Sequence, residues 1–213
     1  MSLEFRDLCA QVGRTVLFDG VSESVAPGEV LAVMGPSGVG KSTLLNVLAG
    51  FDAPNLKCGG SIFLNGRDIS NLPAHQRRLG LVFQSALLFP HLSVGENLGF
   101  GLPGSLRRDE RQARITAALE TAGLAGYGDR DPHGLSGGQK ARVSLMRTLL
   151  SEPLALLLDE PFSALDEELR QDMRAFTQGL IRERQLPTVL VTHDERDAEA
   201  LSARTRRLTG APA

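Results

Sequence analysis

The sequence predicts an α/β protein whose sheet is mostly parallel and is covered by helices on both faces. Apolar runs of strand length recur at 30–34, 79–83, 154–158 and 188–191, and stretches with helical spacing follow several of them. Such alternation is typical of a parallel sheet, because each crossover helix returns the chain to the same end. The first run leads directly into Gly-Pro-Ser-Gly-Val-Gly-Lys-Ser, the G-x-x-x-x-G-K-[ST] phosphate-binding pattern, which indicates that the chain binds a nucleotide.

The first part of the chain is expected to be rich in β-structure. Residues 3–9 and Thr15–Val25 mix apolar and polar side chains at strand spacing. Val30–Met34 is apolar throughout and enters the phosphate loop as a buried strand would. The spacing then predicts a helix over Lys41–Ala49 that Gly50 closes, and residues 61–64 with Asn65-Gly66 predict the start of a hairpin.

The middle of the chain has a different character. Glycines and prolines follow Gln84, and a helix is expected over about 107–122, with Gly123 ending it. We therefore expect one domain, 1–213, whose core covers about 1–84 and 136–213 and whose α-helical insertion covers about 85–135. Helices are predicted at about 166–184 and 194–203. The basic stretches Arg77-Arg78 and 204–207 are expected to be solvated surface.

Composition limits the function classes. The formal net charge of −2 provides no global field that would attract nucleic acid or an anionic membrane. The first residues carry charge where a signal peptide would be apolar, and no run approaches the roughly 20 apolar residues that span a bilayer. We expect any action at a membrane to pass through another subunit. Cys9 and Cys58 show neither metal-site spacing nor a disulfide framework, which fits a reducing compartment.

The phosphate loop carries the strongest chemical signal. Its glycines let backbone N–H groups turn inward around phosphate oxygens, and the following helix adds its dipole. Lys41 is expected to neutralise phosphate charge, and the Ser42 hydroxyl to ligate Mg²⁺. The predicted nucleotide contacts are Gly35, Pro36, Ser37, Gly38, Val39, Gly40, Lys41, Ser42 and Thr43.

Two acids end the apolar run at 154–158. A buried strand holds its terminal carboxylate rigidly, so Asp159 is expected to bind at the Mg²⁺ site. Glu160 is the candidate general base for the attacking water. Many apolar strands end in acids that merely begin a turn. The interpretation of Asp159 and Glu160 as site residues therefore rests mainly on their position after the motif at 135–139.

Leu-Ser-Gly-Gly-Gln at 135–139 predicts a second anion site. Ser136 is a good helix N-cap, and Gly137 and Gly138 let an anion approach backbone N–H groups, with Gln139 following. A glycine-rich cap without a ligand is the alternative. Because the phosphate loop already serves one nucleotide, the simplest interpretation is that this second site serves a different ATP molecule.

These motifs in this order resemble the ATP-binding cassette ATPases, the motor subunits of ABC transporters, over residues from about 3 to 204. The resemblance implies a P-loop core, an N-terminal antiparallel β subdomain and an α-helical insertion. It implies ATP and Mg²⁺ as ligands and a head-to-tail dimer with ATP between two copies of the chain. Gln84 is then expected to touch Mg²⁺ and the attacking water, and His193 to contact the γ-phosphate and orient Glu160. Asp166 lies in the loop expected to connect the two sites.

The chain departs from the family pattern at the adenine contact. The usual spacing places an aromatic residue at position 12, where this sequence has Val12. Val12 is still expected to touch the base through apolar contact, and Arg14 is a candidate platform for it. The regulatory β-domain that many sugar-import ATPases append is expected to be absent.

The resemblance implies an importer. Ser85–Gly99 is similar to the segment after the glutamine in prokaryotic importers of the iron, thiamine, polyamine and molybdate group, where it borders the groove for the permease. Leu87, Leu88 and Phe89 could instead be core of the insertion, and the two interpretations are compatible. The expected partners are a second copy, transmembrane permease subunits and a separate solute-binding protein, with no nucleic acid, at the cytoplasmic face of the inner or plasma membrane. The alternatives are a non-transport ABC ATPase in DNA repair or translation, and a module that binds ATP without turnover.

Overall fold

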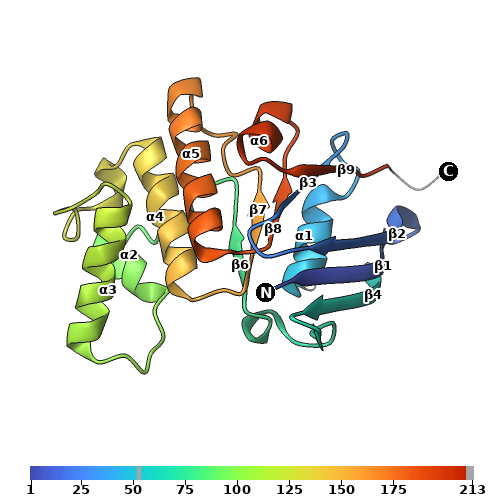
Figure 1. The fold of residues 1–213 in the computed structure, drawn as a ribbon, viewed down its shortest axis with the longest axis horizontal. Coiled ribbons are helices and arrows are strands. Elements are labelled where there is room, and N and C mark those ends of the chain that lie inside the picture. Colours follow the sequence, from blue (N-terminus) through green and yellow to red (C-terminus); the bar gives the residue numbers. More distant parts are fainter. Residues whose placement is uncertain (52–53, 210–213) are drawn as a thin grey trace. The chain divides into compact units, whose positions relative to one another are not determined.

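The computed structural model describes residues 1–51 and 54–209, which divide into two units (Figure 1). The first, here the sheet unit, consists of Met1–Leu81, Leu154–Glu160 and the described part of Arg174–Ala213. The second, the helical unit, consists of Val82–Pro153 and Pro161–Met173. No helix in the described part of the chain is both long and apolar enough to cross a membrane.

A five-stranded sheet forms the centre of the sheet unit, in the order β6-β7-β8-β3-β9. Strands β7, β8, β3 and β9 pair in parallel, with Asp159 opposite Val191 in the register. The middle strands are almost wholly buried because helices cover them, as their continuous apolar runs predict. The strand bounds are β6 Leu79–Val82, β7 Ala155–Asp159, β8 Thr188–Val191, β3 Val30–Met34 and β9 Arg204–Arg207.

Strand β9 corrects one expectation. Its four side chains are exposed, as expected for a basic surface, but its backbone pairs with β3 as the edge of the parallel sheet. Arg204 also donates hydrogen bonds to Glu29 at 2.9 Å and Glu23 at 2.6 Å. Sequence reasoning missed this strand because four polar residues carry no apolar pattern.

A four-stranded antiparallel sheet, ordered β2-β1-β4-β5, completes the strands of the sheet unit. Asn65 and Gly66 form the two-residue turn between β4 and β5, both with positive φ (53° and 76°), so the hairpin prediction is confirmed. Strand β4 begins earlier than residue 61 because its polar, glycine-rich first half pairs with β1. The bounds are β1 Leu3–Val12, β2 Thr15–Val25, β4 Leu56–Leu64 and β5 Arg67–Asp68.

Arg77 is buried, with 6% of its surface exposed, which contradicts the expectation of a solvated side chain. Its guanidinium donates to the carbonyls of Val47 (2.8 Å) and Leu48 (2.9 Å) in the last turn of helix α1, Lys41–Ala49. It also reaches two carbonyls of its own loop, those of Ser70 and Leu72. Carbonyls at a helix C-terminus lack partners within the helix, so a planar cation with several donors fits them.

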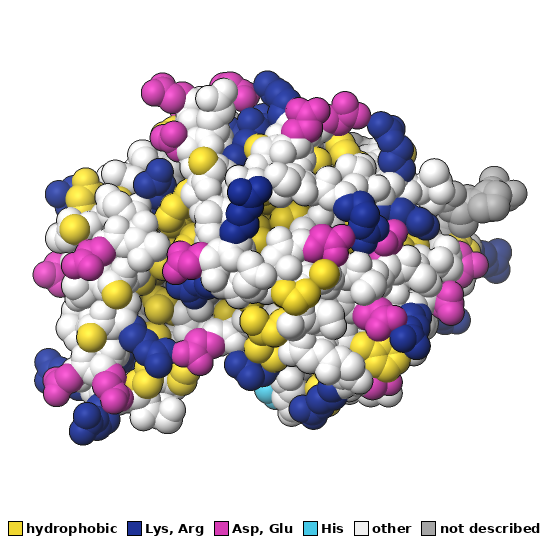
Figure 2. Space-filling model, in the orientation of Figure 1, with side chains coloured by type: hydrophobic (Ala, Val, Ile, Leu, Met, Phe, Trp, Pro, Cys, Tyr) yellow, Lys and Arg dark blue, Asp and Glu magenta, His cyan; other side chains and the backbone are white. Residues whose placement is uncertain are grey.

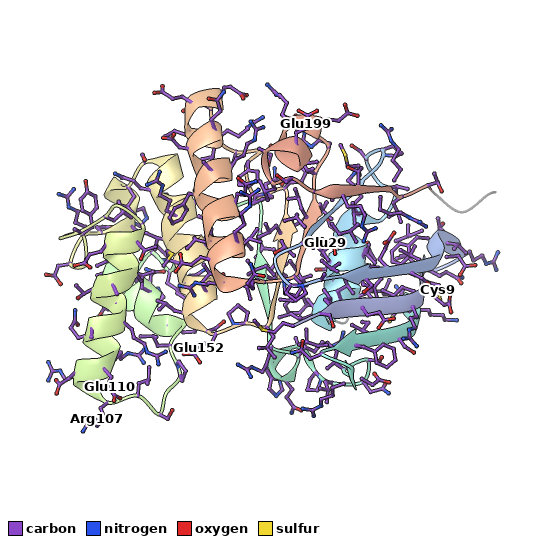
Figure 3. All side chains as sticks on the ribbon, in the orientation of Figure 1. Cys9, Glu29, Arg107, Glu110, Glu152 and Glu199 are labelled. Atoms are coloured by element: carbon purple, nitrogen blue, oxygen red, sulfur yellow. The ribbon has the colours of Figure 1, made fainter. Side chains whose placement is uncertain are left out.

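The helical unit contains α2 Val94–Phe100, α3 Arg108–Thr121 and α4 Gly137–Leu150. The helix predicted at 107–122 is α3, and Figure 3 labels Arg107 and Glu110 at its start, where Glu110 accepts from the Arg107 N–H. Helix α2 was not predicted. Its signal was the capping box of Ser93 and Glu96, which is present in full.

The loop before α2 is held by polar side chains. Asn97 is completely buried, and its amide accepts from the Phe89 N–H and donates to the carbonyls of Phe89, Leu92 and Ser93. Arg147 on α4 donates to the Leu87 carbonyl at 3.0 Å, and burial lowers the pKa of its guanidinium. Helices α5, Glu167–Arg184, and α6, Glu195–Ala200, follow β7 and β8.

Candidate functional site

The phosphate loop joins β3 to α1 in the sheet unit. Gly40 caps α1 with φ of 100°, and a Cβ there would lie 3.0 Å from the Leu17 side chain. A Cβ at Gly35 would lie 2.6 Å from the carbonyl oxygen of Leu208, so both positions require glycine. The first turn of α1 contains no acidic residue that would oppose an anion at this end of the helix.

Lys41 is held at the start of its own helix. Its ammonium donates to the carbonyls of Gly35 at 2.9 Å and Pro36 at 3.0 Å, and the residue is 8% exposed. Both acceptors are neutral, so the positive charge stays available for an anionic ligand.

Ser42 and Asp159 meet beside the loop. The Ser42 hydroxyl donates to Asp159 Oδ1 at 3.0 Å. Burial raises the pKa of Asp159, with the negative Glu160 adding to that rise and the Ser42 hydrogen bond opposing it. A hydroxyl and a carboxylate are hard oxygen donors of the kind that Mg²⁺ prefers, so this pair fits the predicted ion.

Glu160 and His193 lie at the ends of neighbouring strands. Glu160 directly follows β7, and His193 is the second residue after β8. Because β7 pairs with β8, these two residues come together, and Glu160 Oε2 lies 3.2 Å from His193 Nδ1. Glu160 has φ of 45°, an uncommon conformation outside glycine, and its N–H donates to the Val191 carbonyl at 2.9 Å. Strained residues of this kind concentrate at functional sites.

Val12 lies at the end of β1, where it pairs with Thr15 and Leu56. Its side chain is 43% exposed, and Val16 on β2 is 41% exposed. Sequence reasoning named Val12 and Arg14 for the adenine contact but not Val16, which pairs with Gln11 beside Val12. The signal for Val16 was the hairpin itself, which brings apolar residues of β1 and β2 close together.

The remaining predicted site residues belong to the helical unit. Ser136 caps α4 with a full capping box, in which Gln139 N–H donates to the Ser136 hydroxyl and Gln139 Oε1 accepts from the Ser136 N–H. Gly137 and Gly138 begin the helix, as predicted. Asp166 accepts from the Leu169 N–H at 3.0 Å, and Gln84 is exposed just after β6.

The fold and the geometry of the sheet unit define a class. A glycine-rich loop between a buried strand and a helix, with two carboxylates at the end of another parallel strand of the same sheet, is the construction of a P-loop nucleotide-binding protein.

Comparisons with known proteins extend this assignment. Residues 18–163 match the family described as ABC transporter. The chain is 46% identical over 187 residues to the uncharacterized ABC transporter ATP-binding protein YnjD of Escherichia coli, covering 88% of this chain and 86% of that protein. It is 44% identical to the spermidine/putrescine import ATP-binding protein PotA of Nitrosomonas europaea, covering 95% of this chain but 55% of that protein, so it spans about half of that relative.

A solved structure agrees with the fold. The dimeric post-hydrolysis state of the ATP-binding cassette MJ0796 bound to ADP and Pi superposes with a TM-score of 0.79 at 29% identity, covering 97% of this chain and 94% of that one. The chain belongs to the ABC transporter family, as one of its ATP-binding subunits. The expected fold class is confirmed, and so is the expectation of an ATPase.

Proposed function

We propose that this ATPase powers the import of a small solute through a membrane ABC transporter. The observation that carries the proposal is the convergence in one unit of the phosphate loop, the Ser42–Asp159 pair and the Glu160–His193 pair. The import direction follows from relatives named for import of spermidine/putrescine, Fe³⁺ and sulfate/thiosulfate. The core at about 1–84 and 136–213 would bind ATP, and the insertion at about 85–135 would face the permease.

ATP would bind with its phosphates on the loop formed by residues 35–43. Its γ-phosphate would draw the Lys41 ammonium away from the two carbonyls that hold it now. Ser42, Asp159 and Gln84 would hold Mg²⁺, which neutralises charge on the phosphates when it is bound. Val12 would contact the adenine through its exposed apolar surface.

Glu160 would accept a proton from the attacking water. Its carboxylate stands at the end of a rigid, buried strand, so its direction is fixed. His193, 3.2 Å away, would hold Glu160 in place and contact the γ-phosphate. The Glu160–His193 pair favours an ATPase over a module that only binds ATP.

A second copy of the chain would complete each site. The MJ0796 relative is dimeric, which supports a pair of subunits here. Ser136, Gly137, Gly138 and Gln139 would present the N-terminus of α4, a helix of 14 residues, to the ATP of the partner. Asp166 would lie in the loop that connects the two sites.

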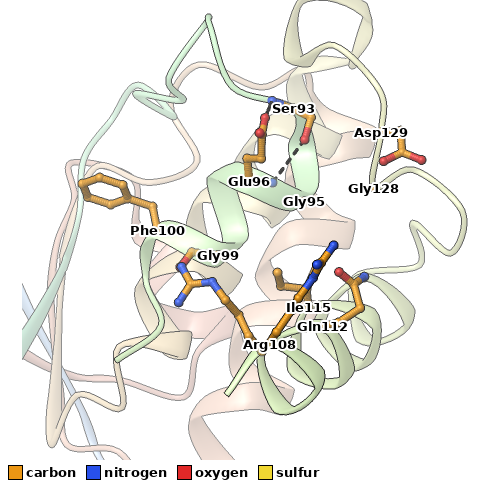
Figure 4. A pocket seen from close by; sticks show the side chains of 11 residues that line it. Ser93, Gly95, Glu96, Gly99, Phe100, Arg108, Gln112, Ile115, Gly128 and Asp129 are labelled. Carbon is orange, nitrogen blue, oxygen red and sulfur yellow. Dashed lines mark hydrogen bonds between the residues drawn. The ribbon is translucent and has the colours of Figure 1, made fainter. Parts of the chain in front are cut away.

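The permease would dock on the helical unit. Phe100 is 66% exposed, and its ring lies 4.6 Å from that of Phe89, which itself is half-buried. Beside Phe100 is a cleft of about 450 Å³ lined by α2, α3 and the segment at 128–129 (Figure 4). Exposed aromatic side chains beside a cleft are typical of protein interaction sites. Phe89 would support this surface through its ring contact with Phe100, so a structural role and an interaction role are compatible for it. Leu88 is half-buried, whereas Leu87 is 56% exposed and is not core of the insertion.

The non-transport alternative is less well supported. DNA-repair and translation ATPases act on nucleic acid, and Figure 2 shows Lys and Arg interspersed with Asp and Glu over the visible face. The import names of the relatives also point away from that class.

Co-purification from the native membrane tests the proposal. The chain should hydrolyse ATP when purified, and it should be recovered with permease subunits at the cytoplasmic face, together with any solute-binding protein they recruit. Charged substitutions at Phe100 should weaken that recovery without changing basal hydrolysis. Recovery with nucleic acid and without a permease would favour the alternative.

A further inference from the structure

The loop that carries His193 is anchored to a buried charged pair within the sheet unit. Arg174 on α5 and Asp197 on α6 are each only 4% exposed. Arg174 donates from Nε and Nη2 to Asp197 Oδ1, at 2.8 and 2.5 Å. The guanidinium therefore fixes one oxygen of the carboxylate and leaves the other free to accept a different bond.

Thr192 takes that second oxygen. Its hydroxyl donates to Asp197 Oδ2 at 2.6 Å, and the residue is 1% exposed. The same hydroxyl oxygen accepts from the backbone N–H of Asp194 at 3.1 Å. The two residues that flank His193 are thus tied through one hydroxyl to the buried carboxylate.

His193 itself is held differently. Its side chain is 64% exposed, so packing does little to fix the ring, although the ring reaches Glu160 at 3.2 Å. The position of the imidazole therefore depends on the backbone of residues 192–194, which the buried network controls.

Stability alone does not account for this network. Buried ion pairs are often no more stabilising than apolar residues of the same volume, because removing both charges from water opposes their attraction. Polar groups behind a functional side chain commonly orient it, and losing them typically lowers activity about 10- to 100-fold in metal sites, where this has been measured.

We propose that Arg174, Asp197 and Thr192 are positioning residues that fix His193 against Glu160. The inference rests on the proposed function, in which His193 acts with Glu160 in hydrolysis. Arg174 orients the carboxylate, the carboxylate orients the Thr192 hydroxyl, and that hydroxyl sets the backbone on both sides of the imidazole.

Thr192→Val is the decisive variant, because it keeps the size and branching of the side chain and removes only the hydroxyl. We expect kcat for ATP hydrolysis by the purified chain with Mg²⁺ to fall about 10-fold or more, with KM for ATP changed less than about twofold. Thr192→Ser restores the hydroxyl and should recover most of kcat. Thermal unfolding of each variant provides the control for stability.

A double-mutant cycle separates this inference from the proposed function. If positioning of His193 is the whole effect, Thr192→Val should cause no further loss in a His193→Ala background. A normal kcat in His193→Ala alone would overturn the role of His193. A reduced kcat in His193→Ala with a normal kcat in Thr192→Val would overturn only the positioning role.

Two further outcomes count against the inference. Equal losses in Thr192→Val and Thr192→Ser would show that the hydroxyl does not matter. Should Thr192→Val be unfolded at the assay temperature, Arg174→Lys replaces it, since it keeps the charge but removes the two-point contact. An unchanged kcat in a folded Arg174→Lys protein would then overturn the proposal.

Discussion

The sheet unit and the helical unit are stabilised in different ways. In the sheet unit, strands such as β7 and β8 bury continuous apolar runs, and the backbone groups of neighbouring strands form hydrogen bonds with one another. In the helical unit, the irregular segment before α2 depends on the side chains of Asn97 and Arg147 for its backbone hydrogen bonds. The first arrangement suits fixed catalytic groups, and the second suits a surface that meets another protein.

The largest effect should come from the chemistry of the sheet unit. Glu160→Gln keeps the shape of the side chain and removes the proton acceptor, so hydrolysis should fall by roughly 10²–10⁴. ATP binding should survive, and an ATP-bound dimer should accumulate, because the substitution leaves unchanged the residues of the helical unit that we propose face the partner. Single-turnover hydrolysis and sedimentation measure both properties. Near-normal turnover would remove Glu160 from the role of base.

The next largest effect is expected from a substitution in the apolar core of the sheet unit. Leu157 in β7 is completely buried, so Leu157→Ala should lower the free energy of unfolding by about 2–5 kcal/mol. Leu87→Ala is the matched control, because Leu87 is 56% exposed. Urea unfolding followed by circular dichroism gives both values. Similar losses in the two variants would contradict the comparison.

The helical unit should respond to the loss of one polar side chain. Asn97→Ala leaves the partly buried N–H and carbonyl of Phe89 without their side-chain partner, which should cost about 1–3 kcal/mol. Hydrogen exchange should accelerate at residues 86–93 and stay slow in β7 and β8. Acceleration in both units would mean that they do not open independently.

Most strands and the motifs of the candidate site could be predicted from the sequence because both depend on local pattern. An apolar run, a glycine-rich loop and an acid at a strand end are each visible in a few residues, as Val30–Met34 and Glu160 illustrate. Strand β9 and the burial of Arg77 could not be predicted. Each depends on a partner far along the chain, β3 for the strand and the end of α1 for the arginine.

The exposed apolar surface near Val12 offers a smaller test. Stacking of a base on an aromatic side chain is worth about 1–3 kcal/mol. Val12→Tyr should therefore tighten ATP binding several-fold, with less effect on turnover at saturating ATP. Nucleotide titration of this variant, Arg14→Ala and Val16→Ala would locate the adenine contact. Unchanged affinity in all three would place the base elsewhere.

The smallest expected effect is a dependence of the unfolding free energy on pH in the acid range. The hydrogen bond from the Arg196 side chain lowers the pKa of Asp194 to about 2 from its ordinary value of 3.8. The folded state therefore favours the charged carboxylate of Asp194. The stabilisation that this charged carboxylate provides is present above about pH 4 and is lost as the pH falls toward 2. Asp194→Asn keeps a capping side chain without the charge. Its difference from wild type in unfolding free energy should therefore shrink below pH 4, and a constant difference would contradict this assignment.

Arg77 gives the phosphate loop a second, remote point of support. The loop stands at one end of α1, and the guanidinium binds the other end from 30 positions away in the sequence. A variant at position 77 would leave every nucleotide contact intact and could still weaken ATP binding, because the helix behind the loop would fray. Sequence changes between residues 70 and 77 should therefore be judged as changes to the nucleotide site, although none of these residues touches the ligand in the mechanism proposed above.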